Sequence, residues 1–331
     1  MGRFPQFLFA AIVAGWASAS PAQVVHRAEL LGAWWLAYSA GLDISGLSEC
    51  GGQLLAVSDK RDDRIYEIRL PAVAQARVAG LSVHWQFEAP RAPAGGDLIS
   101  QLAALVRPDT QMDFEGLTCD GEFTYLVSER HDRITRLKGT AGEVELEWLP
   151  LRWREVAQSQ DYLQVFNAGS EGIAHSGGVA TSVFWVALER QPRGLLRIAT
   201  HGVGEGAGEA ATAALQLLKL PPVGGLDFRG RAEDLTGLDF YEGGLYTLER
   251  NASAVCRRSP ENLEAGWCID FHAIEHAPEF VYADTRFGKA EGLAVTAKGI
   301  FVVLDNNNVA RAADVTDKRA LLMLLAHPDR P

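Results

Sequence analysis

A short pattern of a polar or acidic residue, a glycine and an apolar strand occurs five times along the 331 residues, and it constrains the fold more than any other feature. In each copy a turn follows the strand, and a second apolar run then ends in Asp or Glu. The copies occupy residues 42–60, 113–130, 169–190, 233–250 and 289–306. From each glycine to its strand-end carboxylate the chain advances 13, 13, 17, 12 and 13 residues, so the copies read as repeats of one supersecondary unit.

Each repeat predicts four short β-strands. Two come from the pattern itself, and two further apolar runs follow it: residues 64–70 and 82–87 after the first copy, and 309–315 and 320–326 after the last. Four strands per unit, with turns rich in Gly, Asn and Asp, indicate a blade of a β-propeller. The alternation of strands with amphipathic helices that an α/β fold needs is missing. We therefore predict an all-β protein, a β-propeller of five clear four-stranded blade units, forming one domain over residues 23–331.

The N-terminal segment, residues 24–39, leaves the number of blades open between five and six. It either contributes to a sixth blade or completes the last one, and the second arrangement would remove an exposed sheet edge. Two irregular spacers, residues 89–112 and 152–168, have a partly helical pattern. We expect them to form loops on one face of the disc, where binding residues often lie.

The repeated carboxylates are the candidate functional residues. The first strand of a propeller blade lines the central channel, so the residue before each glycine should point towards a common axis. Those residues are Ser45, Glu115, Glu171, Thr236 and Glu291, and the strand-end residues are Asp59, Glu129, Glu189, Glu249 and Asp305, with Asp43, Asp113 and Asp234 close by in sequence. The sequence predicts a cluster of carboxylates at one mouth of the channel.

Carboxylates this close cannot all stay ionised without compensating positive charge. Basic residues directly follow four of the strand-end carboxylates, namely Lys60, Arg130, Arg190 and Arg250. A hard divalent cation is the other compensation, because an all-oxygen cluster suits calcium, and no histidine accompanies the cluster to favour zinc or copper. A structural role stays open beside this one, in which the carboxylates bond backbone amides of the next blade and the Glu–Arg pairs staple blades together.

The units "DFEGL…YLVSER", "SEGIA…VALER" and "AEGL…VVLDN" resemble the esterase-like phytase family of bacterial exported propellers and, more distantly, the calcium-dependent β-propeller phytases. The resemblance implies calcium ions at the channel mouth that bind substrate phosphate and activate water. It implies Glu115, Glu129, Glu171, Glu189, Glu291 and Asp305 as metal ligands. It also implies that Arg130 and Arg190 face an anionic substrate, since guanidinium suits phosphate geometry. We take Glu115, Glu171, Arg130 and Arg190 as the candidate catalytic residues.

The N-terminus predicts export. A single Arg precedes an apolar stretch of 13 residues and then small residues, which is the layout of a signal peptide spanning residues 1–22, with cleavage after Ala19 or Ala22. No later segment approaches the length of a membrane helix, so we expect a periplasmic or secreted protein. The net charge of −11 becomes −12 without Arg3, and such a surface disfavours nucleic acid and anionic lipid.

The four cysteines predict disulfides, because the exported compartment is oxidising. Cys256 and Cys268 lie 12 residues apart in a strand–turn–strand pattern, which favours a hairpin disulfide. Cys50 and Cys119 occupy nearly matching places in two repeats and could meet across neighbouring strands, although sequence does not fix the connectivity.

One further motif, "HAIEH" at residues 272–276, places two histidines four residues apart. Its acid precedes the second histidine, so the order is not H-E-x-x-H, and we expect a strand or connecting loop rather than a metal site. No G-x-S-x-G occurs, so a serine hydrolase is unsupported.

The expected function is therefore calcium-dependent hydrolysis of a phosphoester or related ester by a monomer that acts on a small anionic or ester substrate. The alternative is a non-catalytic propeller that binds a ligand or protein on the same face.

Overall fold

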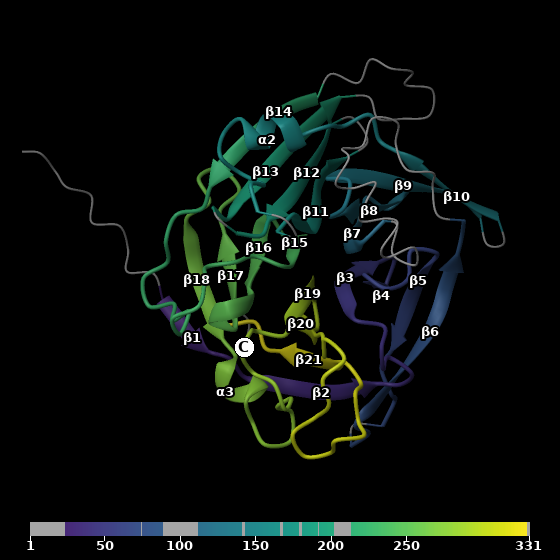
Figure 1. Ribbon diagram of the computed structural model, residues 1–331, viewed down its shortest axis with the longest axis vertical. Helices are drawn as coiled ribbons and strands as arrows, with labels where there is room; N and C mark the ends of the chain where they lie inside the picture. The colour runs from purple at the N-terminus through teal and green to yellow at the C-terminus, as the bar shows by residue number, and fades with distance from the viewer. Residues whose placement is uncertain are drawn as a thin grey trace, which may run out of the picture.

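The strands of the described residues form five mainly antiparallel blades arranged around a central channel, two of them joined into one eight-stranded sheet (Figure 1). The computed structural model describes residues 24–73, 75–88, 112–140, 143–165, 168–178, 181–190, 192–201 and 213–329. The expected signal peptide lies outside these residues, as does nearly all of the spacer 89–112. Within the described residues, no helix is long and apolar enough to cross a membrane.

Every blade contains four strands, taken from the channel outwards. Blade 1 comprises β3 (Ile44–Cys50), β4 (Gln53–Ser58), β5 (Arg64–Arg69) and β6 (Val78–Gln86); blade 2 comprises β7 (Phe114–Cys119), β8 (Thr124–Ser128), β9 (Arg133–Thr140) and β10 (Glu143–Trp148). Blade 3 comprises β11 (Ser170–Gly178), β12 (Thr181–Leu188), β13 (Gly194–His201) and β14 (Ala213–Lys219); blade 4 comprises β15 (Leu238–Tyr241), β16 (Gly244–Glu249), β17 (Ala254–Arg258) and β18 (Ala265–Asp270). Blade 5 comprises β19 (Ala290–Thr296), β20 (Gly299–Leu304), β21 (Leu321–Leu325) and, from the other end of the chain, β2 (Leu30–Leu36).

The N-terminal strands close the ring and settle the question of a sixth blade. Strand β2 pairs antiparallel with β21 and meets β6 of blade 1 in a short parallel pairing. Strand β1 (Val24–Arg27) pairs in parallel with the outer strand of blade 4. The innermost strand of blade 5 also contacts that of blade 1, so the described residues form a closed ring of five blades.

One predicted strand is wrong. Residues 309–315 form turns with isolated bridges at Arg311, and the fourth strand of blade 5 is β2 instead. The segment is rich in Ala, Asp and Arg, which fit a pleated and half-buried surface poorly, and Val315 is 79% exposed. Arg311 pairs with Asp317 at 2.9 Å within this loop.

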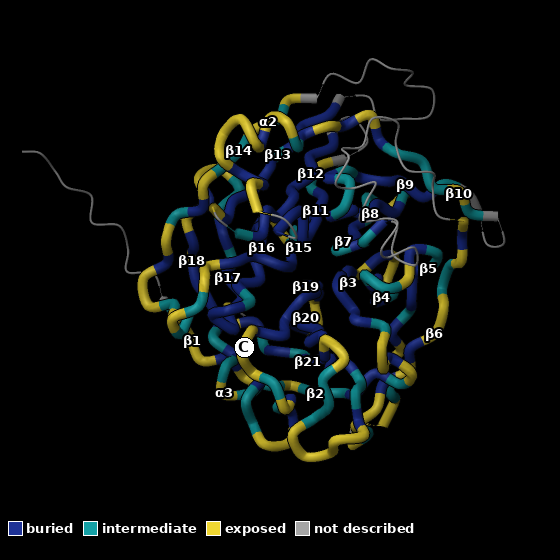
Figure 2. The backbone as a smooth tube through the Cα atoms, viewed as in Figure 1, coloured by how far each residue is buried: buried dark blue, intermediate teal, exposed yellow. Residues whose placement is uncertain are grey.

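Among the described residues, five of the six hydrophobic clusters each lie between two adjacent blades, and a small sixth one surrounds the disulfide of blade 4. The second strand of each blade is buried almost throughout, because neighbouring blades cover both of its faces (Figure 2). This explains why these strands are continuous apolar runs in the sequence rather than alternating ones. Helix α2 (Arg154–Gln158) confirms the partly helical pattern of the second spacer, and its Ala157 packs into the cluster between blades 2 and 3.

Both predicted disulfides are present. Cys256 and Cys268 face each other across β17 and β18 with their Cα atoms 4.0 Å apart. Cys50 and Cys119 join the ends of β3 and β7, with a Cα–Cα distance of 5.9 Å, and so tie the innermost strands of blades 1 and 2 together.

The repeated glycines set how closely the blades approach at the channel. A Cβ atom on Gly46 would lie 2.7 Å from the Cα of Gly116, and one on Gly116 would lie 2.9 Å from the backbone nitrogen of Ile173. The same conflict occurs at Gly172, where a Cβ atom would lie 2.6 Å from the carbonyl oxygen of Thr236. Side chains at these positions would force backbones apart, so the narrow ring explains the glycine of each repeat.

Candidate functional site

In four of the five blades, a β-bulge places the residue before the repeated glycine at the channel mouth. The pairing of the first two strands slips between Phe114 and Gly116 in blade 2, so Glu115 has no partner across the ladder. The same slip occurs at Ser45, Glu171 and Glu291. Because a bulge re-aims the side chain of the extra residue, these positions turn out of the sheet.

The strand-end carboxylates reach the same mouth because the two strands are antiparallel. The backbone N–H of Glu129 donates to the carbonyl of Asp113 at 2.9 Å, and that of Asp305 donates to the carbonyl of Lys289 at 2.7 Å. This hydrogen bond fixes the register of the hairpin and explains the nearly constant spacing seen in the sequence.

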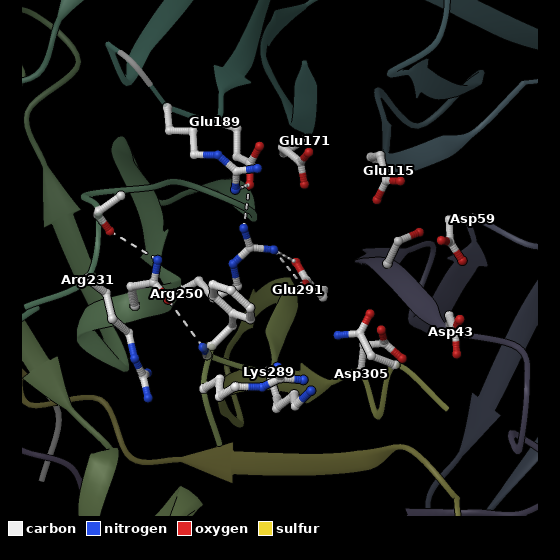
Figure 3. Close-up of a pocket in the computed structure, with 18 of the residues that line it drawn as sticks. Asp43, Asp59, Glu115, Glu171, Glu189, Arg231, Arg250, Lys289, Glu291 and Asp305 are labelled. Atoms are coloured by element: carbon white, nitrogen blue, oxygen red, sulfur yellow. Dashed lines mark hydrogen bonds and ion pairs between the residues drawn. The ribbon is translucent and has the colours of Figure 1, made fainter. Parts of the chain in front are cut away.

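These side chains line a cavity of about 960 Å³ at one mouth of the channel. Loops between blades complete its wall with Arg231, Arg286, Phe287, Lys289 and Asn307. Figure 3 shows that the charged groups are divided between two sides. We call one side the acidic arc, comprising Asp43, Asp59, Lys60, Asp113, Glu115 and Asp305, and the other the basic arc, comprising Glu189, Arg190, Arg231, Arg250, Lys289 and Glu291. Glu171 also lines the cavity and lies between the two arcs in this view.

Arg250 organises the basic arc. Its guanidinium donates to Glu189 at 2.5 Å and to both carboxylate oxygens of Glu291 at 2.8 and 3.0 Å (Figure 3). It also donates to Asp234 at 2.8 Å. Burial disfavours its charge, but the carboxylates of Glu291 and Asp234 raise the pKa of Arg250 well above its ordinary value. The three carboxylates come from blades 3, 4 and 5, so one buried cation links three blades.

Arg231 gives the basic arc a donor without an acceptor. Its Nη1 atom is buried and finds no hydrogen-bond partner among the described residues. Lys289 lines the same side of the cavity (Figure 3). The basic arc can therefore bind an anion.

The acidic arc has acceptors that lack hydrogen-bond donors. One carboxylate oxygen each of Asp43, Asp59 and Asp305 is buried and has no hydrogen-bond donor among the described residues. Lys60 is the basic residue of this arc, 3.1 Å from Asp43 and also bonded to Asp59. Three carboxylates of the arc converge further, since oxygens of Asp59, Asp113 and Glu115 all lie within 4.8 Å of one another.

Burial and mutual repulsion raise the pKa values of these carboxyls. Burial, then the neighbouring Glu171 and Asp59, raise the pKa of Glu115 well above its usual range. Burial raises the pKa of Asp59 to about 7 although Lys60 opposes the shift, and burial together with Asp113 raises the pKa of Glu129 to about 8. Asp305 is shifted in the same direction by burial and by Asp43. A bound cation would relieve both causes, so the residues of the acidic arc fit an oxygen-liganded metal ion.

Several of the predicted positions act as staples between blades. Ser45 donates its hydroxyl hydrogen bond to the carbonyl of Phe114 in blade 2 at 2.6 Å, and Thr236 donates to the carbonyl of Ala290 in blade 5 at 2.9 Å. Glu129 lines the cavity but also accepts the backbone N–H of Gly169 at 3.0 Å.

Glu249 lies outside the cavity lining, fully buried and bonded to Arg193 and to Arg258, the latter at 2.7 Å. It therefore has the structural role that the sequence left open.

Most of the proposed site residues are brought together. Glu115, Glu129, Glu171, Glu189, Glu291, Asp305 and Arg190 all line the cavity, whereas Arg130 is not among its lining residues. Sequence reasoning left Arg231, Arg250 and Lys289 out of the site. Arg250 carried the same Glu–Arg signal as Arg190, but Arg231 and Lys289 come from the connections into β15 and β19, outside the strand-end positions that pointed to the site.

The fold and the site define the protein as a five-bladed β-propeller with a charged cavity at one mouth. Residues 41–308 match the family model of phytase-like proteins, described as esterase-like activity of phytase, and the chain belongs to this family. Comparison with curated protein sequences gives no match.

Two solved structures are similar to the chain. A glutaminyl cyclase from Myxococcus xanthus has 15% identity and a TM-score of 0.48, covering 92% of this chain and 98% of its own. A PQQ-bound aldose sugar dehydrogenase from Streptomyces coelicolor has 12% identity and a TM-score of 0.42, covering 90% of this chain and 98% of its own.

Proposed function

We propose that this protein is an exported, calcium-dependent hydrolase of a phosphoester or related ester, working in the periplasm or outside the cell. The observation that carries the proposal is that one cavity contains both buried hydrogen-bond acceptors without donors and a buried donor without an acceptor. Among the described residues, three buried carboxylate oxygens without donors lie in the acidic arc, and a buried guanidinium nitrogen without an acceptor lies in the basic arc, which also contains one such oxygen of Glu189. A calcium ion and an anionic substrate together would satisfy both sides, and the family assignment favours the same chemistry.

The acidic arc would hold the cation through Asp59, Asp113 and Glu115, with Asp43 and Asp305 within the same arc. When bound, calcium would neutralise these carboxylates, polarise an oxygen of the substrate and lower the pKa of water. Glu129, Glu189 and Glu291 remain possible further ligands, although Arg250 already bonds the last two.

The chain's own residues would bind and orient the ester. Arg190, Arg231 and Lys289 would hold its anionic group and stabilise the negative charge that develops as water attacks. Glu171, between the two arcs, would accept the proton of the attacking water and pass it to the oxygen of the leaving alcohol as the ester bond breaks, so that the carboxylate is regenerated. Arg250 would act as a positioning residue, because its hydrogen bonds to Glu189 and Glu291 keep both carboxylates on the wall of the cavity.

The first test is calorimetric titration of calcium into the chelator-treated protein, residues 23–331, and into the Glu115→Gln/Glu171→Gln variant. We expect binding in the wild type and its loss in the variant, because an amide cannot supply the charge that calcium prefers. Turnover of inositol hexakisphosphate, p-nitrophenyl phosphate and p-nitrophenyl butyrate, measured on the same samples, should fall in parallel while the fold persists.

The rival function is a binding propeller in which calcium only stiffens the ring. The hydroxyl staples of Ser45 and Thr236 and the buried Glu249 support it, since they show that repeat positions can be purely structural. That function predicts calcium binding and a calcium-dependent melting temperature with no turnover of any of the three esters. Absence of calcium binding in the wild type would remove the metal mechanism.

A further inference from the structure

A second cluster of metal-ligand side chains lies outside the cavity lining, on the connection between β18 and β19. The sequence predicted a strand or loop for "HAIEH", but its first four residues form the short helix α3 (His272–Glu275), and His276 caps the helix. One helical turn brings positions four apart onto one face, so the two histidines become neighbours with ring centroids 3.9 Å apart. The strand is ruled out because Phe271, Ile274 and Glu275 take part in the hydrogen bonds of this turn.

Glu275 completes the cluster from the same turn. One nitrogen of His272, one nitrogen of His276 and one carboxylate oxygen of Glu275 all lie within 4.8 Å of one another. Zinc binds such ligands at about 2.0–2.2 Å, usually in a tetrahedron. Small side-chain rotations would therefore close three ligands around one ion and leave the fourth position to water.

The surrounding hydrogen bonds already orient the three side chains. The Nδ1 atom of His276 lies 3.2 Å from the carbonyl oxygen of His272. When Nδ1 carries the ring proton and donates it to this oxygen, the lone pair of Nε2 is free to bind a metal ion. Glu275 is buried and held at both oxygens, by the hydroxyl of Ser253 at 2.6 Å and by the backbone N–H of Lys289 at 3.2 Å. Partners of this kind fix ligand orientation around metal ions.

The charges facing the cluster are mixed. Arg229 lies 3.5 Å from the carboxylate of Asp270, and Asp270 also accepts the backbone N–H of His272 at 2.7 Å. Arg231 is a further positive charge that acts on His272, and it donates a hydrogen bond to the carbonyl of Thr285. Burial, then His276 and Arg229, lower the pKa of His272 to about 4.

We propose that His272, His276 and Glu275 form a binding site for a borderline divalent transition metal ion such as zinc, separate from the acidic arc. Imidazole nitrogen suits zinc, whereas the all-oxygen acidic arc suits calcium, so the two sites would take different ions. The site would act on the cavity through Glu275, because this residue holds the backbone of Lys289, which lines the cavity wall.

The test is titration of zinc into the chelator-treated protein in the presence of excess calcium, which keeps the acidic arc occupied. We expect one equivalent to bind, and cobalt in its place to give the visible absorption of a low-coordinate site. His272→Ala/His276→Ala should weaken zinc binding at least about 100-fold, and Glu275→Gln by about 10-fold or more. Unchanged zinc affinity in the double variant, or no zinc binding by the wild type, would overturn the proposal.

Two controls make these outcomes specific. His84→Gln removes a histidine of β6 in blade 1, outside the connection that carries α3, and should leave zinc binding unchanged. Glu115→Gln/Glu171→Gln should lose calcium and keep zinc, so failure of one site is distinguishable from failure of the other. Circular dichroism melting of each variant checks the fold, and Glu275→Gln serves as the second variant if the double histidine change unfolds the protein.

Discussion

The two sides of the cavity contain the same kind of side chain in different electrostatic states. In the basic arc, Glu189 and Glu291 share the guanidinium of Arg250. In the acidic arc, Asp59 and Asp43 share the single ammonium of Lys60, and each keeps one buried oxygen without a donor. Burial raises pKa values on both sides, but Arg250 opposes the shift at Glu189 and Glu291.

This difference shows that the carboxylates of one repeat family have separated into two roles. Those of the basic arc are paired with arginines and hold blades 3, 4 and 5 together, and among them one oxygen of Glu189 lacks a donor within the described residues. Those of the acidic arc depend on something from outside the chain, either protons or a cation. A fivefold structural device would be compensated equally all round the ring, and this one is not.

The largest effect should come from removing the central cation of the basic arc. Arg250→Met leaves Asp234 and Glu291 buried without their arginine and Glu189 paired with Arg190 alone, and breaking a buried pair in this way costs about 3–5 kcal/mol. Urea unfolding of the calcium-loaded protein measures the change. Arg286→Met is the matched control, since this arginine is exposed and pairs only with Asp284 among the carboxylates described, and its stability should stay close to wild type. Equal stability of the two variants would show that the blades do not depend on Arg250.

A smaller effect should follow from pH in the calcium-free protein. Asp59 and Glu129 have pKa values of about 7 and 8 in the folded state, above the pKa values of these carboxyls in the unfolded chain. At any pH between the unfolded and the folded pKa, the folded state therefore binds more protons than the unfolded state. The free energy of unfolding should therefore fall as pH rises from 5 to 8, with the melting temperature dropping by about 5 °C.

Calcium provides the matching control, because it competes with the same protons. Scanning calorimetry should show that added calcium raises the melting temperature more at pH 8 than at pH 5. A calcium-free melting temperature that rises over this range would contradict the compensation argument for the acidic arc.

The smallest effect should come from replacing Lys60, the basic residue of the acidic arc. The side chain of Lys60 is 41% exposed, so Lys60→Met should cost about 1 kcal/mol or less in the calcium-loaded protein. Calcium affinity should rise, because a competing positive charge leaves the arc. Chemical unfolding and calorimetric titration measure the two quantities, and a loss as large as that of Arg250→Met would erase the distinction between the arcs.

The sequence by itself determined the blades and most of the carboxylate cluster. Both follow from local rules: a two-strand hairpin fixes the distance from Gly116 to Glu129, and a bulge next to a glycine that admits no Cβ turns Glu115 out of the sheet. The hairpin occurs in all five blades and the bulge in four of them, so the periodicity is visible without any knowledge of long-range contacts.

Only the tertiary structure decided which charges meet. Arg130 and Arg250 follow a strand-end Glu in the same way, yet only Arg250 lines the cavity, while Arg231 and Lys289 join it from connecting segments. The pairing of β2 with β21 joins residues from opposite ends of the chain. These outcomes depend on how loops and blades pack in space, and burial then sets the pKa of each carboxyl, which sequence spacing does not encode.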